Sequence, residues 1–442
     1  MGAVRRTAAG CLVLLASGAA LRAATLESRL GTSFGITANA GTDGADPVVT
    51  ARSVASGDMA LPLWSELHSA PMMAALVARA NQDRALGLKV LFGFSPTSIN
   101  GLRTEIDLPP WVAAGCGVST ATVSFSNPCV KNYFIADATT VAAALQPDYF
   151  HVATEINTLI LRQVAQPADL EYVHFGQLYQ QVYSAIKAVR PTCQVFVSFQ
   201  YELQLRFERD NPGVWNSLLD VYRGPGVSKL DVVGYTSYPC QNGFSDSKFA
   251  QAWQIPGNYY APAAAHLTGA ERTFFSEVGW PSRGSGTESS QRGFVERLPE
   301  LMAPARPVFV VWTLLHDVPS AVFSGNVDLA SVGVRAEDGS PKPAWEVLTG
   351  AVAGDPFRNT RAYPSPFKPG ASPWVLTGLP PNLPFKIYDL TGRAVVSLTT
   401  NEFGGAQWDG RDGGGRLLES GLYFVLLRSD GRTKKIRLVL QR

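Results

Sequence analysis

Short apolar runs alternate with helix-like stretches along most of this 442-residue chain, and this alternation restricts its fold more than any other feature. Eight runs have the length and composition of β-strands: 33–37, 58–64, 89–94, 149–155, 194–202, 230–239, 272–280 and 307–315. Between them, 71–87, 172–190 and 288–302 repeat apolar residues every three or four positions, as amphipathic helices do. Strands that alternate with helices form parallel sheets, and eight such units predict a closed (β/α)8 TIM barrel of the α/β class.

The N-terminal segment has the composition of an export signal. Residues 1–24 contain a basic pair, Arg5 and Arg6, then a short apolar stretch, then small residues. This order is typical of a secretory signal peptide, and no later segment approaches the roughly 20 consecutive apolar residues of a membrane anchor. A lipoprotein signal centred on Cys11 is the less favoured alternative, because the apolar stretch follows that cysteine. We therefore expect a secreted protein and, at a formal net charge of +2, no nucleic-acid partner.

The other four cysteines are Cys116, Cys129, Cys193 and Cys240. None belongs to a CxxC pair, and export favours disulfides over metal ligation, so we expect no metal site. No organic cofactor is expected either. Cys116 and Cys129 lie in the long segment after the third strand and could close it as a disulfide. Cys193 precedes the fifth strand and Cys240 follows the sixth, so the two are expected at opposite ends of the barrel, about 20 Å apart. That separation excludes a bridge between them.

Two glutamates stand at the ends of predicted strands. Glu155 ends the fourth strand in HVATEIN, and Glu277 lies near the end of the seventh in FFSEVGWPS. Barrel enzymes gather their chemistry at the C-terminal ends of the strands, so both carboxylates are predicted to meet above the barrel. Side-chain alternation places Glu155 on one face with Asn157, and Glu277 on one face with Phe275. The alternative for each glutamate is a salt bridge or a position in a solvated loop.

Further polar and aromatic residues are expected near these carboxylates. Gln200 and Glu202 share the inward face of the fifth strand, and we interpret them as substrate contacts unless they only fill the polar barrel mouth. Four tryptophans could stack on sugar rings or pack in the core: Trp64, Trp111, Trp280 and Trp312. Trp280 could instead brace the loop after Glu277.

Taken together, these segments resemble the retaining β-glycosidases of glycoside hydrolase clan A over roughly residues 30–350. SEVGWPS is similar to the nucleophile segment of plant-type β-1,3-glucanases and of arabinogalactan endo-β-1,4-galactanases, and TEIN to the acid/base segment of the galactanases. YTSYP and VVWTLLHD are similar to the segments that carry a tyrosine and a tryptophan in this clan. The resemblance implies that Glu155 is the acid/base and Glu277 the nucleophile. It also implies a hydrogen bond from Tyr238 to Glu277 and a place for Trp312 under the sugar.

The chain departs from the clan pattern in two places. Thr154 stands directly before Glu155, where clan members usually have an asparagine that binds the sugar 2-hydroxyl; Asn157 could substitute. The arginine often found near the end of strand two is missing from DMALPLWSELH. These departures keep open an alternative, a catalytically inactive surface protein that binds carbohydrate on the same barrel.

Residues 353–442 are predicted to form a separate small β-sandwich. The segment opens with the proline-rich FRNTRAYPSPFKPG and continues as short strands joined by glycine-rich turns. YPSPF, KIYDLTGR, WDGRD and SGLYFVLL resemble the Ig-like modules of the type IX secretion sorting family and of flagellar hook-capping proteins. The resemblance implies a bacterial exported protein whose tail engages secretion machinery or the cell surface. A tight turn explains the acidic loop from Asp409 to Asp412 better than a calcium site does.

The sequence therefore predicts a signal peptide (1–24), a barrel (25–352) and an appended sandwich (353–442). The favoured function is a secreted, monomeric, retaining β-glycoside hydrolase that cleaves a polysaccharide of the galactan or β-glucan type. In such chemistry one carboxyl protonates the leaving oxygen while the other attacks the anomeric carbon, with the two about 5 to 5.5 Å apart. A weaker alternative is that only the tail matters, as a module for adhesion or surface display.

Overall fold

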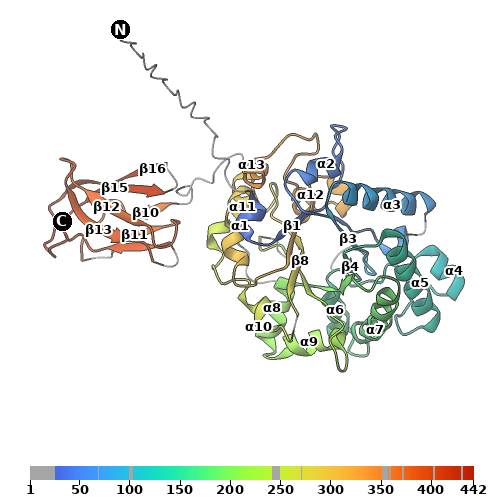
Figure 1. Cartoon of the computed structure of the whole chain (residues 1–442). Helices are drawn as coiled ribbons and strands as arrows, with labels where there is room; N and C mark the ends of the chain where they lie inside the picture. The colour runs from blue at the N-terminus through green and yellow to red at the C-terminus, as the bar shows by residue number, and fades with distance from the viewer. Residues whose placement is uncertain are drawn as a thin grey trace, which may run out of the picture.

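The computed structural model describes residues 25–67, 69–98, 103–240, 249–269, 271–350, 357, 360–370, 373–401, 404–429 and 432–442. Within these ranges the chain forms a ring of helices around parallel strands, followed by a unit made only of antiparallel strands (Figure 1). The expected signal peptide and the start of the junction at 351–356 lie outside the described residues.

The predicted barrel is confirmed, and all eight predicted strands are present. They are β1 (Ser33–Ile36), β2 (Gly57–Ala60), β3 (Lys89–Gly93), β4 (Tyr149–His151), β5 (Gln194–Phe196) with β6 (Ser198–Gln200), β7 (Val233–Ser237), β8 (Thr273–Val278) and β9 (Phe309–Trp312). The parallel sheet has the order β5-β4-β3-β2-β1-β9-β8-β7-β6. Only Val197 separates β5 from β6, so these two are halves of the predicted fifth strand, and the sheet closes on itself there.

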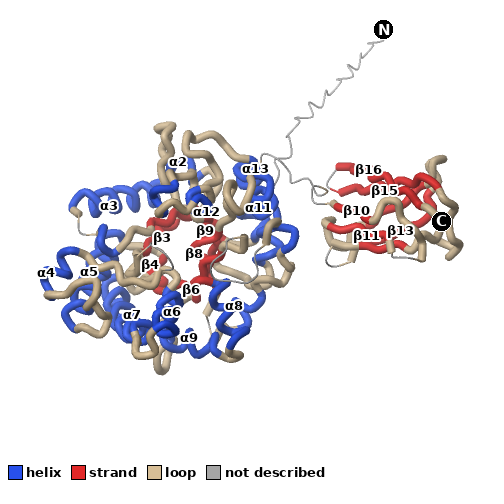
Figure 2. Tube along the Cα trace, turned by 180° about the vertical axis from the view of Figure 1, so that it is seen from behind, coloured by secondary structure: helices blue, strands red, loops and turns tan. Residues whose placement is uncertain are grey.

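Helices cover the outside of the strands, as Figure 2 shows. The three helices expected from periodicity are α3 (Ala70–Ala85), α7 (Glu171–Val189) and α11 (Glu288–Met302). The others in this unit are α1 (Leu26–Leu30), α2 (Pro47–Arg52), α4 (Pro110–Cys116), α5 (Pro128–Leu145), α6 (Leu159–Ala165), α8 (Tyr201–Asp210), α9 (Val214–Arg223), α10 (Ala261–Ala265), α12 (Val327–Ala330) and α13 (Pro343–Thr349). No helix in the described part of the chain is long and apolar enough to span a membrane.

The interior of the barrel is filled by large apolar side chains, so it is a core and not a channel. Phe196, Phe274 and Phe309 belong to one buried cluster, and the rings of Phe274 and Phe309 lie 5.5 Å apart. Gly57 is required beside them, because a Cβ on that residue would lie 2.6 Å from the Phe309 ring. This packing closes the barrel interior and leaves the C-terminal strand ends for polar groups.

The C-terminal unit contains two antiparallel sheets, as predicted. One sheet has the order β10-β11-β14 and the other β13-β12-β15-β16. Their strands are β10 (Arg361–Tyr363), β11 (Trp374–Thr377), β12 (Pro384–Tyr388), β13 (Ala394–Thr399), β14 (Ala406–Trp408), β15 (Gly421–Ser429) and β16 (Arg432–Leu440). Asp409 and Asp412 accept hydrogen bonds from backbone N–H groups of their own turns, which supports the turn interpretation of this loop.

The expected loop disulfide is present between Cys116, at the end of α4, and Cys129, in the first turn of α5. It fixes the two helices that follow β3 to each other. Cys193 and Cys240 are both buried and do not bridge each other, in agreement with their predicted separation.

Candidate active site

Glu155 reaches the barrel mouth through a turn. The strand β4 ends at His151, four residues before the predicted end, and Glu155 has a left-handed backbone with φ of 52°. This conformation is uncommon for residues other than glycine and is concentrated at functional sites. Strand alternation therefore does not set the direction of this side chain, and the predicted shared face with Asn157 is wrong for that reason. The backbone N–H of Glu155 donates to Ser198 Oγ at 3.1 Å, which ties this turn to β6.

The carboxylate of Glu155 is almost buried and has two partners. Its Oε1 accepts a 2.7 Å hydrogen bond from Thr236 Oγ1 on β7, and its Oε2 lies 3.1 Å from Nε of Arg103. Only 6% of the residue is exposed. A carboxylate held on both oxygens has a defined orientation, which a catalytic acid or base requires.

Glu277 lies on an irregularity of β8. Against β7 the register shifts between Tyr235 and Thr236, and against β9 it shifts between Phe275 and Val278. Such β-bulges break side-chain alternation and re-aim a side chain, often beside an active site. Phe275 accordingly packs in the outer core while Glu277 meets Tyr238 near the mouth, so the predicted shared face of Phe275 and Glu277 is wrong.

The two oxygens of Glu277 have different surroundings. Tyr238 donates a 2.6 Å hydrogen bond to Oε2, as the sequence predicts, whereas Oε1 is buried without a hydrogen-bond partner in the described structure. Burial raises the pKa of Glu277 to about 7. The positive charge of Arg103 opposes this rise in pKa, the negative charge of Glu155 adds to it, and the Tyr238 hydrogen bond lowers it. The two glutamates therefore lie within electrostatic range of each other.

The sequence did not indicate Arg103 and Thr236 as residues of the site. Arg103 comes from the segment after β3, where its backbone φ is 54°, and not from the end of strand two. Thr236 is aligned with Glu277 in the β7–β8 pair while its hydroxyl binds Glu155. No motif marks either residue, although the polar TS pair within the apolar strand VVGYTSYP was a usable signal for Thr236.

Gln200, Glu202 and Asn157 form a buried group of hydrogen-bonded side chains. Gln200 donates to Glu202 Oε2 at 2.7 Å, and Asn157 bonds the Gln200 backbone and Gln204. Glu202 also accepts a hydrogen bond from Ser237 at 2.5 Å, and burial raises its pKa while the Ser237 hydrogen bond lowers it. At most 3% of each residue is exposed, and their polar groups are hydrogen-bonded to one another and to neighbouring residues of the fold.

The tryptophans are placed mainly in the core. Trp64, Trp280 and Trp312 have no exposed surface, and their indole N–H groups donate to Asp137, Ser290 and the carbonyl of Val332. Trp312 thus has no accessible face on which a sugar could stack in this structure. Trp280 braces the segment after Glu277, the role that the sequence left open for it. Trp111 on α4 is half-buried.

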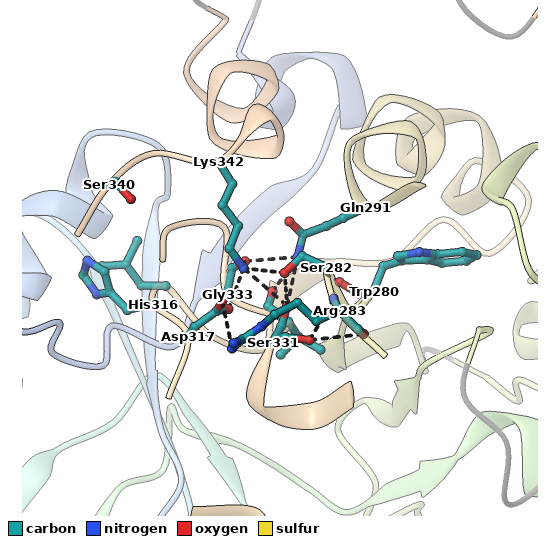
Figure 3. Close-up of polar contacts among 12 residues, drawn as sticks. Trp280, Ser282, Arg283, Gln291, His316, Asp317, Ser331, Gly333, Ser340 and Lys342 are labelled. Carbon is teal, nitrogen blue, oxygen red and sulfur yellow. Dashed lines mark hydrogen bonds and ion pairs between the residues drawn. The ribbon is translucent and has the colours of Figure 1, made fainter. Parts of the chain in front are cut away.

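A buried polar cluster fixes the chain that follows Glu277 (Figure 3). Lys342 Nζ donates to Ser282 Oγ at 2.8 Å, to Asp317 Oδ1 at 2.6 Å and to the carbonyl of Gly333 at 2.8 Å. Gln291 on α11 adds hydrogen bonds to the carbonyls of Trp280 and Gly333. Burial lowers the pKa of Lys342 and raises that of Asp317, and the attraction between the two opposes both shifts. The cluster joins the segment after β8 to the segments after β9.

The arrangement supplies two carboxylates with different environments at one end of a barrel, the combination that acid catalysis and nucleophilic attack require. Thr154, in place of the usual asparagine, is fully buried and its Oγ1 has no hydrogen-bond partner in the described structure. No group of three or more His, Cys, Asp or Glu that could hold a metal occurs among the described residues.

Several solved structures share this architecture. No family model matches the chain, and no curated protein sequence matches it. A form of GH5_18 from Streptomyces cattleya, solved with Manβ1-4GlcNAc, gives a TM-score of 0.54 at 15% identity over 77% of this chain and 86% of its own. GH5_18 from Bifidobacterium longum gives a TM-score of 0.53 at 14% identity, over 72% of this chain and 78% of its own. The exo-β-1,4-mannosidase Op5Man5 from Opitutaceae bacterium strain TAV5 gives a TM-score of 0.52 at 16% identity, over 72% of this chain and 58% of its own. At these identities the likeness shows the barrel fold.

Proposed function

We propose that this chain is a retaining β-glycoside hydrolase that uses Glu277 as nucleophile and Glu155 as acid and then base. The main support is the difference between the two carboxylate oxygens of Glu277. Tyr238 donates a hydrogen bond to Oε2, while Oε1 is buried and has no hydrogen-bond partner in the described structure. An oxygen that no protein donor occupies keeps its lone pairs for the anomeric carbon that a bound substrate would bring to it. The carboxylate of Glu155 lies close enough to affect the pKa of Glu277, as a cooperating acid must.

The acid step requires a change around Glu155. In this structure Arg103 contacts Oε2, as it would an ionised carboxylate. To protonate a leaving oxygen, Glu155 must carry a proton, so the aglycone has to displace Arg103 from that oxygen. In the second step Glu155 accepts a proton from water, and contact with Arg103 then stabilises the carboxylate.

The substrate that we propose is a β-linked polysaccharide, with galactan and β-glucan as candidates from the sequence. The solved neighbours named for β-1,4-mannoside chemistry add β-mannan to these candidates. The disulfide between Cys116 and Cys129 supports secretion to an oxidising compartment, because such bonds persist there. The buried Thr154 supports the alternative, a binding protein without activity, because it cannot contact a sugar 2-hydroxyl.

The test is hydrolysis across a panel of β-linked galactans, glucans and mannans, with the anomeric configuration of the products followed by NMR. Wild-type protein is compared with Glu277→Ala, Glu155→Ala and a control, Glu337→Ala, at an exposed glutamate. We expect retained configuration in wild type and control and loss of turnover in both site variants. Inversion, or equal activity in Glu277→Ala, would refute the mechanism. Binding without cleavage by wild type would favour the inactive carbohydrate-binding alternative.

A further inference from the structure

Charge is distributed unevenly along the chain. Residues 353–442 contain 13 Lys and Arg against 7 Asp and Glu, whereas residues 25–352 contain 22 Lys and Arg against 29 Asp and Glu. The overall charge of +2 therefore hides a cationic C-terminal segment attached to an anionic barrel segment. An excess of one sign on a small unit attracts partners of the other sign.

Within this C-terminal unit, arginines outside the strands have counter-charges. Four such arginines each pair with a carboxylate: Arg393 with Asp389, Arg411 with Asp409, Arg416 with Asp412 and Arg442 with Glu419. These pairs account for local turn structure and leave no charge imbalance where they occur. The unbalanced cations must lie elsewhere in the unit.

Four cations outside these pairs lie on one face of the four-stranded sheet: Lys386, Arg428, Lys435 and Arg437. Directly paired residues share a face, and the register aligns Lys386 with Leu426 and Leu426 with Lys435 across β12, β15 and β16. The neighbouring row aligns Tyr388, Phe424 and Arg437. We name this surface the cationic sheet face and define it by the following residues: Lys386, Tyr388, Leu422, Phe424, Leu426, Arg428, Lys435 and Arg437.

This face is directed away from the core of the sandwich. The alternate residues Phe385, Ile387, Val425 and Leu427 form the buried cluster between the sheets, so their neighbours in sequence point outward. The four cations of the face are exposed, while its apolar members are half-buried. Among the described residues, none of the four cations forms an ion pair, and no carboxylate lies on the face.

The geometry suits an extended anionic chain. Two strand spacings of about 4.8 Å separate Lys386 from Lys435, and Lys435 and Arg437 are about 7 Å apart along β16. Like charges at this spacing repel one another, and an anionic ligand that bridges them removes the repulsion. Lys435 Nζ lies 3.8 Å from the centre of the Phe424 ring, so cations and apolar surface form one continuous patch. Such a patch offers apolar contact to the C–H faces of sugar rings and ion pairs to their acidic groups.

We propose that the cationic sheet face binds an acidic polysaccharide, a chain of carboxylated sugars. The choice of a polysaccharide among polyanions rests on the proposed function, because a glycan-binding unit joined to a glycosidase raises the local substrate concentration. The need for an anionic partner rests only on the unpaired charges. The barrel site and the sheet face would then act on one polymer, at separate positions.

The test measures binding of the full chain carrying Glu277→Gln, which prevents turnover, to polygalacturonate by affinity electrophoresis, with neutral galactan as the matched glycan. Lys435→Gln combined with Arg437→Gln removes two charges from the face. The control, Arg393→Gln with Arg416→Gln, removes two charges from carboxylate pairs in the same unit. We expect the face variant to bind polygalacturonate about tenfold more weakly, with added salt reducing binding of the parent. The control should stay within about twofold of the parent, because its charges are already neutralised.

An equal loss of polygalacturonate binding in the control variant would overturn the proposal, since net charge alone would then explain the binding. Tighter binding to double-stranded DNA or to anionic lipid vesicles would also overturn it, as would equal binding to neutral galactan. Thermal unfolding of every variant separates lost binding from lost folding. Hydrolysis of small neutral oligosaccharides by chains with an intact Glu277 tests the proposed function separately, so either proposal can fail while the other stands.

Discussion

The Tyr238 hydroxyl lies 2.6 Å from Oε2 of Glu277, and it also contacts Thr313 Oγ1 at 2.9 Å. Tyr238 therefore orients one oxygen of the carboxylate, while the other, Oε1, is buried without a hydrogen-bond partner in the described structure. Burial raises the pKa of Tyr238 well above 10, and the charge of Glu277 adds to this, so the phenol remains a donor throughout the working pH range.

Replacement of Tyr238 by phenylalanine is expected to shift the acidic limb of kcat/KM to higher pH. The nucleophile must be ionised, and its pKa of about 7 places that limb near neutrality in wild type. The lost hydrogen bond favoured the ionised form, so its removal raises this pKa further. At neutral pH kcat/KM should fall by about 10- to 100-fold, the range expected for the loss of a hydrogen bond to a charged group. The control is Tyr259→Phe, which removes a hydroxyl that donates to Glu202 and should leave the acidic limb of kcat/KM in place. An unmoved acidic limb in Tyr238→Phe would contradict the assignment of Glu277 as the nucleophile.

Arg103→Gln tests the cation that faces both carboxylates. The positive charge of Arg103 lowers the pKa of Glu277, so its removal should move the acidic limb upward by about one pH unit. Arg103→Lys keeps the charge and should restore most of the wild-type limb, although it cannot reproduce the fixed guanidinium geometry. Complete pH profiles of kcat/KM for the three proteins give this comparison. If the glutamine and lysine variants have identical profiles, the charge of Arg103 plays no part.

The sequence predicted the parts of this molecule that depend on periodic patterns. All eight strands, three long helices and the antiparallel tail follow from alternation and helical spacing, and the Tyr238 contact with Glu277 followed from the family resemblance. Periodic patterns also implied that strands continue to Glu155 and Glu277. The left-handed turn at Glu155 and the bulge at Glu277 interrupt both strands, so the predicted faces failed beyond His151 and Phe275.

Local sequence patterns do not predict contacts between segments that are far apart in the chain. Arg103 meets Glu155 from a segment 52 positions earlier in the chain, and nothing in its neighbourhood distinguishes it from a solvated arginine. Trp312 illustrates a different limit, because its position at a strand end suited a sugar platform, whereas in the structure it is fully buried and donates to the carbonyl of Val332. Such burial depends on tertiary packing, which a single sequence does not specify locally.

His151 is expected to make the protein sensitive to acid. It is fully buried in the barrel, stacked at 4.8 Å on Phe196, and burial lowers its pKa from 6.5 to about 3. Between these two values the unfolded chain binds a proton that the folded chain does not, so stability falls as pH falls from 6.5 toward 3. The slope from this residue approaches about 1.4 kcal/mol per pH unit. His151→Phe keeps a flat ring and cannot titrate, so its unfolding free energy should depend less on pH between 4 and 6. Urea denaturation at several pH values measures this, and identical slopes in both proteins would refute it.

The Asp317 carboxylate has two cationic partners in different environments, which allows burial to be separated from charge. Lys342 lies 2.6 Å from Oδ1 with 3% of its side chain exposed, whereas Arg283 lies 3.5 Å from Oδ2 with 58% exposed. Lys342→Ala leaves the buried carboxylate with only the exposed Arg283 as a cationic partner, which should cost about 3 to 5 kcal/mol of unfolding free energy. Arg283→Ala removes an exposed partner of the same carboxylate and should cost at most about 1 kcal/mol.

Lys342→Met combined with Asp317→Leu removes both buried charges and should recover most of the stability lost in Lys342→Ala, because the desolvation penalty disappears with them. Denaturant titrations of the four proteins measure these differences. Ser282, the other side-chain partner of Lys342, lies five residues after Glu277, so Lys342→Ala should also reduce kcat more than it changes KM. Equal losses of stability in Lys342→Ala and Arg283→Ala would show that charge alone, and not the buried position, determines the contribution of this pair.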